Sequence, residues 1–200
     1  MMKRVFLLLF FVSNSLIAQS NLPSSANDIS PLLIGEKVPN LSLKDTNGKS
    51  VNFSDLISSK KTILVFYRGG WCPYCNTHLS ALAETESQLI AQGYQIVAIS
   101  PDSPKSLMET QTKEKLNYIL LSDSGGEFAK AFGIAFQAPE NYGKYLKKSS
   151  ENLNTDLYIP VPSLFILNQS GTIIFEYISP DYKQRITNDL LLSVVKSLKK

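Results

Sequence analysis

The chain is poor in the residues that build covalent or metal-bonded scaffolds. Its 200 residues include only two cysteines and one histidine. Two cysteines are too few for a small domain held together by disulfides, and with one histidine they are too few for a four-ligand zinc site. Charged residues make up only 18%, whereas hydrophobic residues make up 44%, which excludes a disordered chain. The composition predicts one folded domain of ordinary size.

A strong net charge is also lacking. The 20 Lys and Arg residues stand against 17 Asp and Glu residues, a formal net charge of +3. A nucleic-acid binder collects its basic residues on one face. Two of the basic residues here are Lys3 and Arg4, so 20 − 2 = 18 remain against 17 acidic residues if residues 1–20 are removed. We therefore expect no nucleic-acid partner.

Residues 1–20 have the layout of a secretory signal peptide. Lys3 and Arg4 precede an apolar run at residues 5–12 (VFLLLFFV), and small residues follow at 18–20. Even residues 5–18 are shorter than the roughly 20 residues that span a bilayer, and no cysteine follows for a lipid anchor. We expect cleavage and export to the periplasm or the extracellular space, where disulfides are permitted, with no stable membrane anchor.

The rest of the chain alternates strand-like and helix-like segments. Residues 21–34, rich in Ser, Asn and Pro, predict a linker or loosely attached tail before a domain at 35–200. Strands are predicted at 41–43, 50–53, 62–67, 94–100, 118–121, 163–167 and 172–177, and helices at 73–92, from Ser103-Pro104 onward, at 126–132 and at 186–198. Residues 134–160 show no period and predict an irregular polar excursion. The order predicts an α/β fold with a central mixed sheet flanked by helices and a hairpin at its start.

Both cysteines fall in one tetrapeptide, Cys72-Pro73-Tyr74-Cys75, between a buried strand and a helix. The positive helix end and its unpaired backbone N–H groups stabilise a thiolate and lower the pKa of a cysteine there. Arg68, four residues before Cys72, adds positive charge. The C-x-x-C spacing also lets the two sulfurs form a small disulfide ring. The segment predicts a redox-active cysteine pair.

Other interpretations of the tetrapeptide remain open. The cysteines can be two free buried thiols, or a permanent disulfide that stabilises little because its loop is so short. Cys72, Cys75 and His78 also have the spacing C-x-x-C-x-x-H, which suits a metal ion, although no fourth ligand is visible. Covalent haem attachment is excluded because Asn76, not histidine, follows the second cysteine. For His78 itself we expect a place on the helix surface.

Residues 65–79 (VFYRGGWCPYCNTHL) resemble the active-site segment of the peroxiredoxins of the alkyl hydroperoxide reductase and thiol-specific antioxidant family. Further segments agree with that family in order and spacing: residues 41–56, 94–132, 161–173 and 179–185. The resemblance implies a thioredoxin-like fold and a cysteine that attacks the O–O bond of a peroxide. The resulting sulfenic acid condenses with a second thiol to a disulfide, which an external thioredoxin-like dithiol protein reduces.

The family pattern Pro-x-x-x-Thr-x-x-Cys fits this sequence only in part. By the resemblance, Cys75 takes the place of the peroxide-attacking cysteine, Cys72 stands where the family has threonine, and Arg68 stands where it has proline. The family's supporting arginine aligns with Pro162 and is missing. Since Arg68 and Arg185 are the only arginines after residue 20, one of them must substitute for it.

Two features are instead similar to thioredoxin itself. Trp71-Cys72-x-x-Cys75 resembles a disulfide-exchange motif, in which the first cysteine is the nucleophile and the second resolves. Residues 161–163 (VPS) resemble the segment in which thioredoxins carry a cis-proline beside the disulfide. On that resemblance we expect a cis bond before Pro162, although a trans proline opening a strand is the ordinary alternative.

Three functions follow. The leading hypothesis is a thiol peroxidase without a bound cofactor, in which Cys75 attacks the peroxide, Cys72 resolves and Arg68 stabilises the thiolate. The second is a thiol–disulfide oxidoreductase of exported proteins, in which Cys72 attacks. The third is a metal or copper carrier that uses Cys72, Cys75 and His78. Residues 134–160 form either a flap over the site or a surface excursion.

Overall fold

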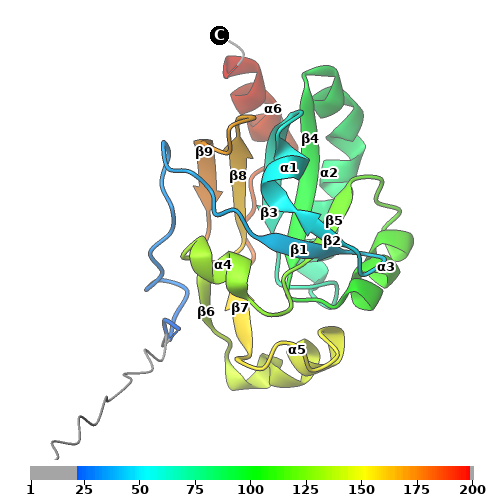
Figure 1. Cartoon of the computed structure of the whole chain (residues 1–200), viewed down its shortest axis with the longest axis vertical. Helices are drawn as coiled ribbons and strands as arrows, with labels where there is room; N and C mark the ends of the chain where they lie inside the picture. Colours follow the sequence, from blue (N-terminus) through cyan, green and yellow to red (C-terminus); the bar gives the residue numbers. More distant parts are fainter. Residues whose placement is uncertain (1–21, 199–200) are drawn as a thin grey trace, which may run out of the picture.

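A computed structural model describes residues 22–198 of the chain. Seven strands form one mixed sheet in the order β2-β1-β5-β4-β3-β8-β9, and β6 and β7 form a separate two-stranded sheet (Figure 1). The predicted signal peptide and its cleavage site lie outside the described residues. The strands are β1 Ser42–Asp45, β2 Ser50–Asn52, β3 Lys61–Phe66, β4 Tyr94–Ser100, β5 Ile119–Ser122, β6 Ala135–Gln137, β7 Tyr158–Pro160, β8 Ser163–Leu167 and β9 Ile173–Ile178.

Strands β3, β4 and β5 are parallel and form the centre of the sheet, while β8 runs antiparallel to β3 on its other side. The register pairs apolar residues with each other, for example Ile63 with Ile96 and Leu64 with Phe165. Strands buried on both faces read as continuous apolar runs, as β3 (KTILVF) and β4 (YQIVAIS) do. The predicted mixed α/β architecture is confirmed.

Helices cover both faces of this sheet (Figure 1). One apolar core lies between the sheet and α2, α3 and α6, and the other lies between the sheet and α1 and α4. The helices are α1 Phe53–Ile57, α2 Pro73–Ala91, α3 Pro104–Lys113, α4 Glu127–Ala131, α5 Gly143–Ser149 and α6 Asn188–Ser197, with a 3₁₀ turn η1 at Glu140–Tyr142.

The hairpin predicted near the start of the domain is present as β1 and β2. Asp45 makes its turn, because its side chain accepts hydrogen bonds from the backbone N–H groups of Asn47 and Lys49, both at 2.9 Å. Strand β1 then pairs antiparallel with β5, so the hairpin extends the central sheet at one edge. The hairpin extension is therefore part of the sheet rather than an appendage.

Residues 134–160 differ from the irregular excursion that the sequence predicts. The segment contains β6, η1, α5 and β7, and Leu146 of α5 is buried with Ala138 and Ile159 in a small core of their own. Its ends are tied together because β6 pairs antiparallel with β7. The prediction was wrong because the regular structure of this segment depends on contacts between its two ends and with the active-site loop. Contacts of this kind leave no short-range hydrophobic period in the sequence.

The segment before the domain is also ordered against it. Residues 22–34 lie along α4 and β6, with Ser30 N–H donating to Gly133 O at 3.1 Å and Leu32 N–H donating to Phe132 O at 3.0 Å. Leu22, Ile29 and Leu32 pack against the core on the α1 and α4 side of the sheet. The part of the predicted linker that the structure describes is thus attached to the domain rather than loose.

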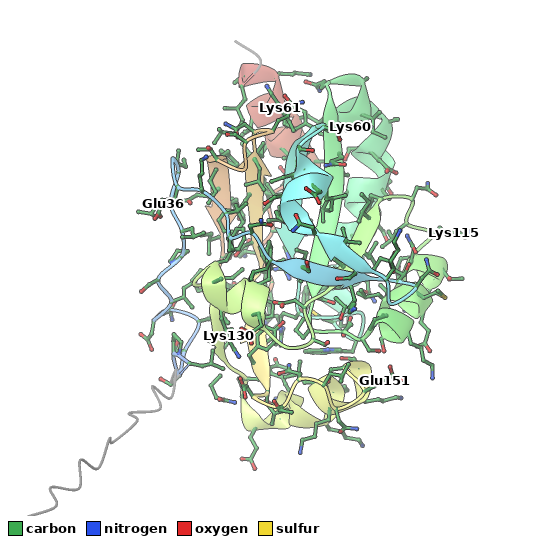
Figure 2. The ribbon with its side chains drawn as sticks, in the orientation of Figure 1. Glu36, Lys60, Lys61, Lys115, Lys130 and Glu151 are labelled. Carbon is green, nitrogen blue, oxygen red and sulfur yellow. The ribbon has the colours of Figure 1, made fainter. Side chains whose placement is uncertain are left out.

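The surface charges are dispersed. Figure 2 shows Lys60 and Lys61 near the top, Lys115 at the right and Lys130 at the lower left, so these labelled lysines do not form one basic face. Lys130 of α4 pairs with Asp156 at 2.6 Å. Within residues 22–198, no helix combines the length and the apolar character that crossing a bilayer requires.

Candidate active site

The cysteine pair lies where β3 ends and α2 begins. Cys72 is the N-cap residue of α2, with extended backbone angles (φ −93°, ψ 112°), and Pro73 opens the helix. The Cys72 carbonyl accepts hydrogen bonds from the N–H groups of Cys75 at 3.0 Å and Asn76 at 3.1 Å. Cys72 therefore sits at the positive end of a long helix, and Cys75 lies within its first turn, as the sequence predicts.

A short loop, residues 68–71, brings the chain from β3 to Cys72. Gly69 has φ +133°, a conformation that favours glycine, and a side chain there would collide with Trp71 and Asp102. Gly70 N–H donates to Asp102 Oδ2 at 2.8 Å, and Gly70 O accepts from Asn76 Nδ2 at 2.9 Å. The loop is thus fixed on one side by Asp102 and on the other by α2.

Asp102 is a site residue that the sequence reasoning missed. It is fully buried, and burial raises the pKa of its carboxyl group above the ordinary value of 3.8. It lies two residues after Ser100, the last residue of β4, which is the parallel neighbour of β3. The carboxyl ends of neighbouring parallel strands lie at the same edge of a sheet, so the position of an acid just after β4 is the signal that points to it.

Both sulfurs are shielded from solvent. Cys72 is 1% exposed and Cys75 is 0% exposed, and both are free thiols in this structure. Cys75 packs in the core with Tyr67 and Leu79. A peroxide or a thiol must therefore enter through local movement of the residues around the pair.

The two thiols differ in acidity. The pKa of Cys72 is lowered from 9.0 to about 6, first by its hydrogen-bonding interaction with the Cys75 thiol, then by the Cys75 N–H and the charges of Arg68 and Arg185, against the opposing effect of burial. Burial, followed by the interaction with Cys72, raises the pKa of Cys75 well above 9.0. The reduced pair therefore holds one negative charge at neutral pH, and that charge resides mainly on Cys72.

Each sulfur has its own arginine. Arg68 Nη1 lies 4.0 Å from Cys72 Sγ, and Arg185 Nη2 lies 3.5 Å from Cys75 Sγ. The sequence hypothesis assigns Arg68 to an attacking Cys75, whereas the structure places Arg68 beside Cys72. Arg185, the other arginine named in the sequence hypothesis, is the one beside Cys75.

Arg68 is held by aromatic rings rather than by a carboxylate. Its guanidinium carbon lies 4.3 Å from the ring centres of both Tyr142 and Tyr182 and 5.2 Å from that of Trp71. Arg68 is buried, and within residues 22–198 it makes no ion pair. Such contacts hold a cation without neutralising it, so the full charge of Arg68 acts on Cys72.

The segment 134–160 supplies part of this aromatic cluster. Tyr142 packs on Trp71 with ring centres 5.4 Å apart, and Tyr145 stacks on Trp71 at the same distance with a 20° angle between the planes. Trp71 in turn packs against the small core of Ala138, Leu146 and Ile159. Of the two possibilities for this segment, the structure supports the flap beside the site.

The expected cis bond before Pro162 is wrong. All peptide bonds of the described residues are trans, including Val161–Pro162. Pro162 instead continues the extended path from β7 into β8, with its carbonyl accepting from Ser179 N–H at 3.1 Å. Trans is the lower-energy form of an X-Pro bond, and nothing in this extended path requires the other. Pro162 still lies near the site, because it lines a pocket of about 170 Å³ together with Arg68, Tyr142 and Tyr182.

The expectation for His78 is also wrong. His78 is only 8% exposed, and burial, with a smaller effect of the Arg185 charge, lowers its pKa from 6.5 to about 4. The C-terminal segment covers it, because the start of α6 packs on α2 through Asn188 Nδ2, which donates to Ala81 O at 2.8 Å. Across the described part of the chain, no three His, Cys, Asp or Glu residues are grouped to hold a metal ion, so the metal hypothesis gains no support.

A central mixed sheet with an acidic cysteine and a second thiol at the start of the helix after β3 defines a thiol-dependent oxidoreductase. Comparison with known proteins gives the family. The model of the AhpC/TSA family matches residues 34–176, and the chain therefore belongs to the AhpC/TSA family.

Curated relatives and solved structures agree with this assignment. The chain is 28% identical over 170 residues to the putative peroxiredoxin bcp of Haemophilus influenzae, covering 85% of this chain and 100% of that protein. It is 26% identical to peroxiredoxin Bcp of Escherichia coli, covering 84% and 98%. The fold is similar to that of reduced Prx3 from Vibrio vulnificus (TM-score 0.71, 16% identity, 82% and 99% covered) and of peroxidoxin BcpB from Mycobacterium tuberculosis (TM-score 0.66, 19% identity, 84% and 98% covered).

The resemblance to the peroxiredoxins is thus confirmed, as is the thioredoxin-like fold. The chain is a peroxiredoxin-type oxidoreductase, a thiol-dependent peroxidase.

Proposed function

We propose that this protein is an exported peroxidase that reduces hydrogen peroxide or organic hydroperoxides with the pair Cys75 and Cys72. A thioredoxin-like dithiol protein then reduces the resulting disulfide. Export is supported by the signal-peptide layout of residues 1–20, and the recycling step by the C-x-x-C spacing, which suits disulfide exchange.

The proposed reaction begins with a proton shared between the two sulfurs. When the proton lies on Cys72, Cys75 is the thiolate and attacks the distal oxygen of ROOH. The O–O bond breaks, Cys75 becomes a sulfenic acid, and the leaving RO⁻ takes the proton of the Cys72 thiol to give ROH. The Cys72 thiolate then attacks the sulfur of the sulfenic acid, which forms the Cys72–Cys75 disulfide and releases hydroxide.

The observation that carries this proposal is the contact between Arg185 and Cys75. The guanidinium, 3.5 Å from Cys75 Sγ, stabilises the thiolate there and provides N–H donors beside the place where the peroxide oxygens react. Arg185 Nη1 is itself held by the carbonyls of Tyr182 and Gln184, both at 2.6 Å. A preorganised donor of this kind lowers the barrier without reorganising during the reaction.

A second candidate function is thiol–disulfide exchange with exported proteins, in which Cys72 attacks and Cys75 resolves. The observation that favours it is the pKa of about 6 for Cys72, which makes this cysteine the resident thiolate at neutral pH. The two functions use the same pair of sulfurs in opposite order.

Single substitutions of the two cysteines distinguish these functions. For the peroxidase, we expect Cys75→Ser to abolish peroxide consumption, and Cys72→Ser to leave a sulfenic acid on Cys75 that a dimedone probe traps. If Cys72→Ser is the inactive variant and Cys75→Ser accumulates mixed disulfides with proteins, the exchange function replaces the peroxidase. Reduced wild-type protein that consumes peroxide no faster than a free thiol also rules out the peroxidase.

A further inference from the structure

A second pocket is lined by Arg185. It has a volume of about 610 Å³ and is bounded by α2 and by the segment that leads into α6. Its walls include Tyr74 and Ala81 of α2 and Ile186 of the C-terminal segment. This volume falls within the range of pockets that hold small organic molecules. The pocket is separate from the 170 Å³ pocket at Arg68, because no residue lines both.

The charged residues that line this pocket include more basic than acidic side chains. Lys183 and Arg185 line it, against one acidic lining residue, Asp189. Neither Lys183 nor Arg185 makes an ion pair within residues 22–198. The ten-residue helix α6 also begins here, at Asn188, and its positive end adds to the attraction for an anion.

Two buried polar atoms of residues that line this pocket have no hydrogen-bond partner within residues 22–198. His78, 8% exposed, lines the pocket, and its Nε2 atom is buried with no hydrogen-bond partner. The Nε atom of Arg185 is likewise buried and unpartnered. Buried polar atoms are nearly always hydrogen-bonded in folded proteins, so two such atoms close together are unusual. His78 and Arg185 also line a small enclosed cavity of about 10 Å³ beside Pro162, so the case for a ligand in the larger pocket rests on its shape and charge.

We propose that this pocket binds a small organic carboxylate, with the carboxylate at Lys183 and the apolar body between Tyr74 and Ile186. Arg185 lines the pocket and also contacts Cys75, so it links the bound molecule to the reacting sulfur. The use of the site in the reaction rests on the proposed peroxidase function, whereas the binding itself does not.

Two kinds of molecule share this chemistry. A carboxylate-bearing thiol is a reductant: two RSH reduce the Cys72–Cys75 disulfide to two thiols and leave as RSSR. A carboxylate-bearing hydroperoxide is an oxidant: ROOH leaves as ROH after giving one oxygen to the sulfur. Both carry a negative group for Lys183 and a reactive group for the cysteine pair.

Binding is tested by calorimetry with 3-phenylpropionate and its uncharged amide, which have the same shape. We expect the acid to bind the reduced wild-type protein about fivefold more tightly than the amide, because one ion pair near the protein surface changes affinity by about this factor. This preference should disappear in Lys183→Glu and remain in the control Lys196→Glu, which makes the same charge change at the exposed far end of α6. Equal affinity of acid and amide for the wild type, or an unchanged preference in Lys183→Glu, overturns the site.

Kinetic measurements then distinguish whether the carboxylate belongs to a thiol reductant or to a hydroperoxide. One arm compares 3-mercaptopropionate with 3-mercaptopropionamide as reductants of the oxidised protein. The other compares the para-carboxylate of cumene hydroperoxide with cumene hydroperoxide itself. A preference for the acid of about fivefold in kcat/KM that Lys183→Glu removes supports the thiol or the hydroperoxide, according to the arm in which it appears. Acid binding without a preference in either arm overturns the link to the reaction. If the wild-type protein does not consume peroxide, the proposed function is overturned, but the binding result still stands.

Discussion

Arg185 Nη2 lies 3.5 Å from Cys75 Sγ, although 110 residues separate the two in the chain. The guanidinium reaches the sulfur from the segment before α6, where backbone carbonyls fix its orientation. Cys75 is fully buried, so this contact is the close positive charge that a thiolate there depends on.

The first prediction concerns Arg185 itself. Arg185→Gln should lower kcat/KM for hydrogen peroxide by roughly 100-fold, because it removes a preorganised charged donor from the reacting sulfur. Arg185→Lys should recover only part of the rate, since a lysine lacks the planar fork of donors. Stopped-flow peroxide consumption by the reduced protein measures both. Wild-type rates in Arg185→Gln would show that Arg185 has no part in the reaction.

The second prediction concerns the acidity of Cys72. Its pKa of about 6 means that the thiolate forms as pH rises through 6, so the rate of alkylation by iodoacetamide should rise between pH 5 and 7 and then level off. An ordinary thiol would continue to gain reactivity up to about pH 9. Mass spectrometry of the digested protein measures the fraction of Cys72 that iodoacetamide has alkylated at each pH. Arg68→Met should move the midpoint to higher pH, because the Arg68 charge lowers this pKa. A midpoint near 9 in the wild type would contradict the prediction.

The third prediction concerns the loop before Cys72. A side chain at Gly70 would collide with Thr110 Oγ1, whereas one at Gly125 would meet nothing within 4 Å. Gly70→Ala should therefore reduce the free energy of unfolding in urea by about 1–3 kcal/mol, and Gly125→Ala should change it by less than about 0.5 kcal/mol. Neither glycine has a positive φ, so the pair separates crowding from backbone strain.

The double variant Gly70→Ala with Thr110→Ala provides the check on this cause. It should recover most of the loss, because it removes the colliding atom. If the double variant is as unstable as the sum of its single variants, the collision with Thr110 is not the reason for the loss.

Short-range signals explain how much of the fold the sequence predicts. The turn at Asp45 and the helix start at Ser103 and Pro104 appear as expected, and Ser103 Oγ accepts from Ser106 N–H at 3.3 Å. Cys72 and Cys75 were placed correctly for the same reason, since a strand, a short loop and a helix determine their positions. These features depend on residues within a few positions of one another.

Long-range contacts explain what the sequence did not predict. Nothing near His78 indicates that the segment before α6 buries it, and nothing near Arg185 indicates that it reaches Cys75. The order of residues 134–160 likewise depends on Tyr142 packing against Arg68 and Trp71. The trans bond before Pro162 follows from the extended path between β7 and β8, which only the folded chain defines.

Trp71 is the only tryptophan in the chain, and its neighbour in the sequence is Cys72. Its ring is stacked on Tyr145 and close to Arg68. The indole therefore gives the protein a built-in optical reporter. A change of oxidation state at the sulfurs, or a displacement of α5, alters the surroundings of a single fluorophore, and the emission of the unlabelled protein follows both events in real time.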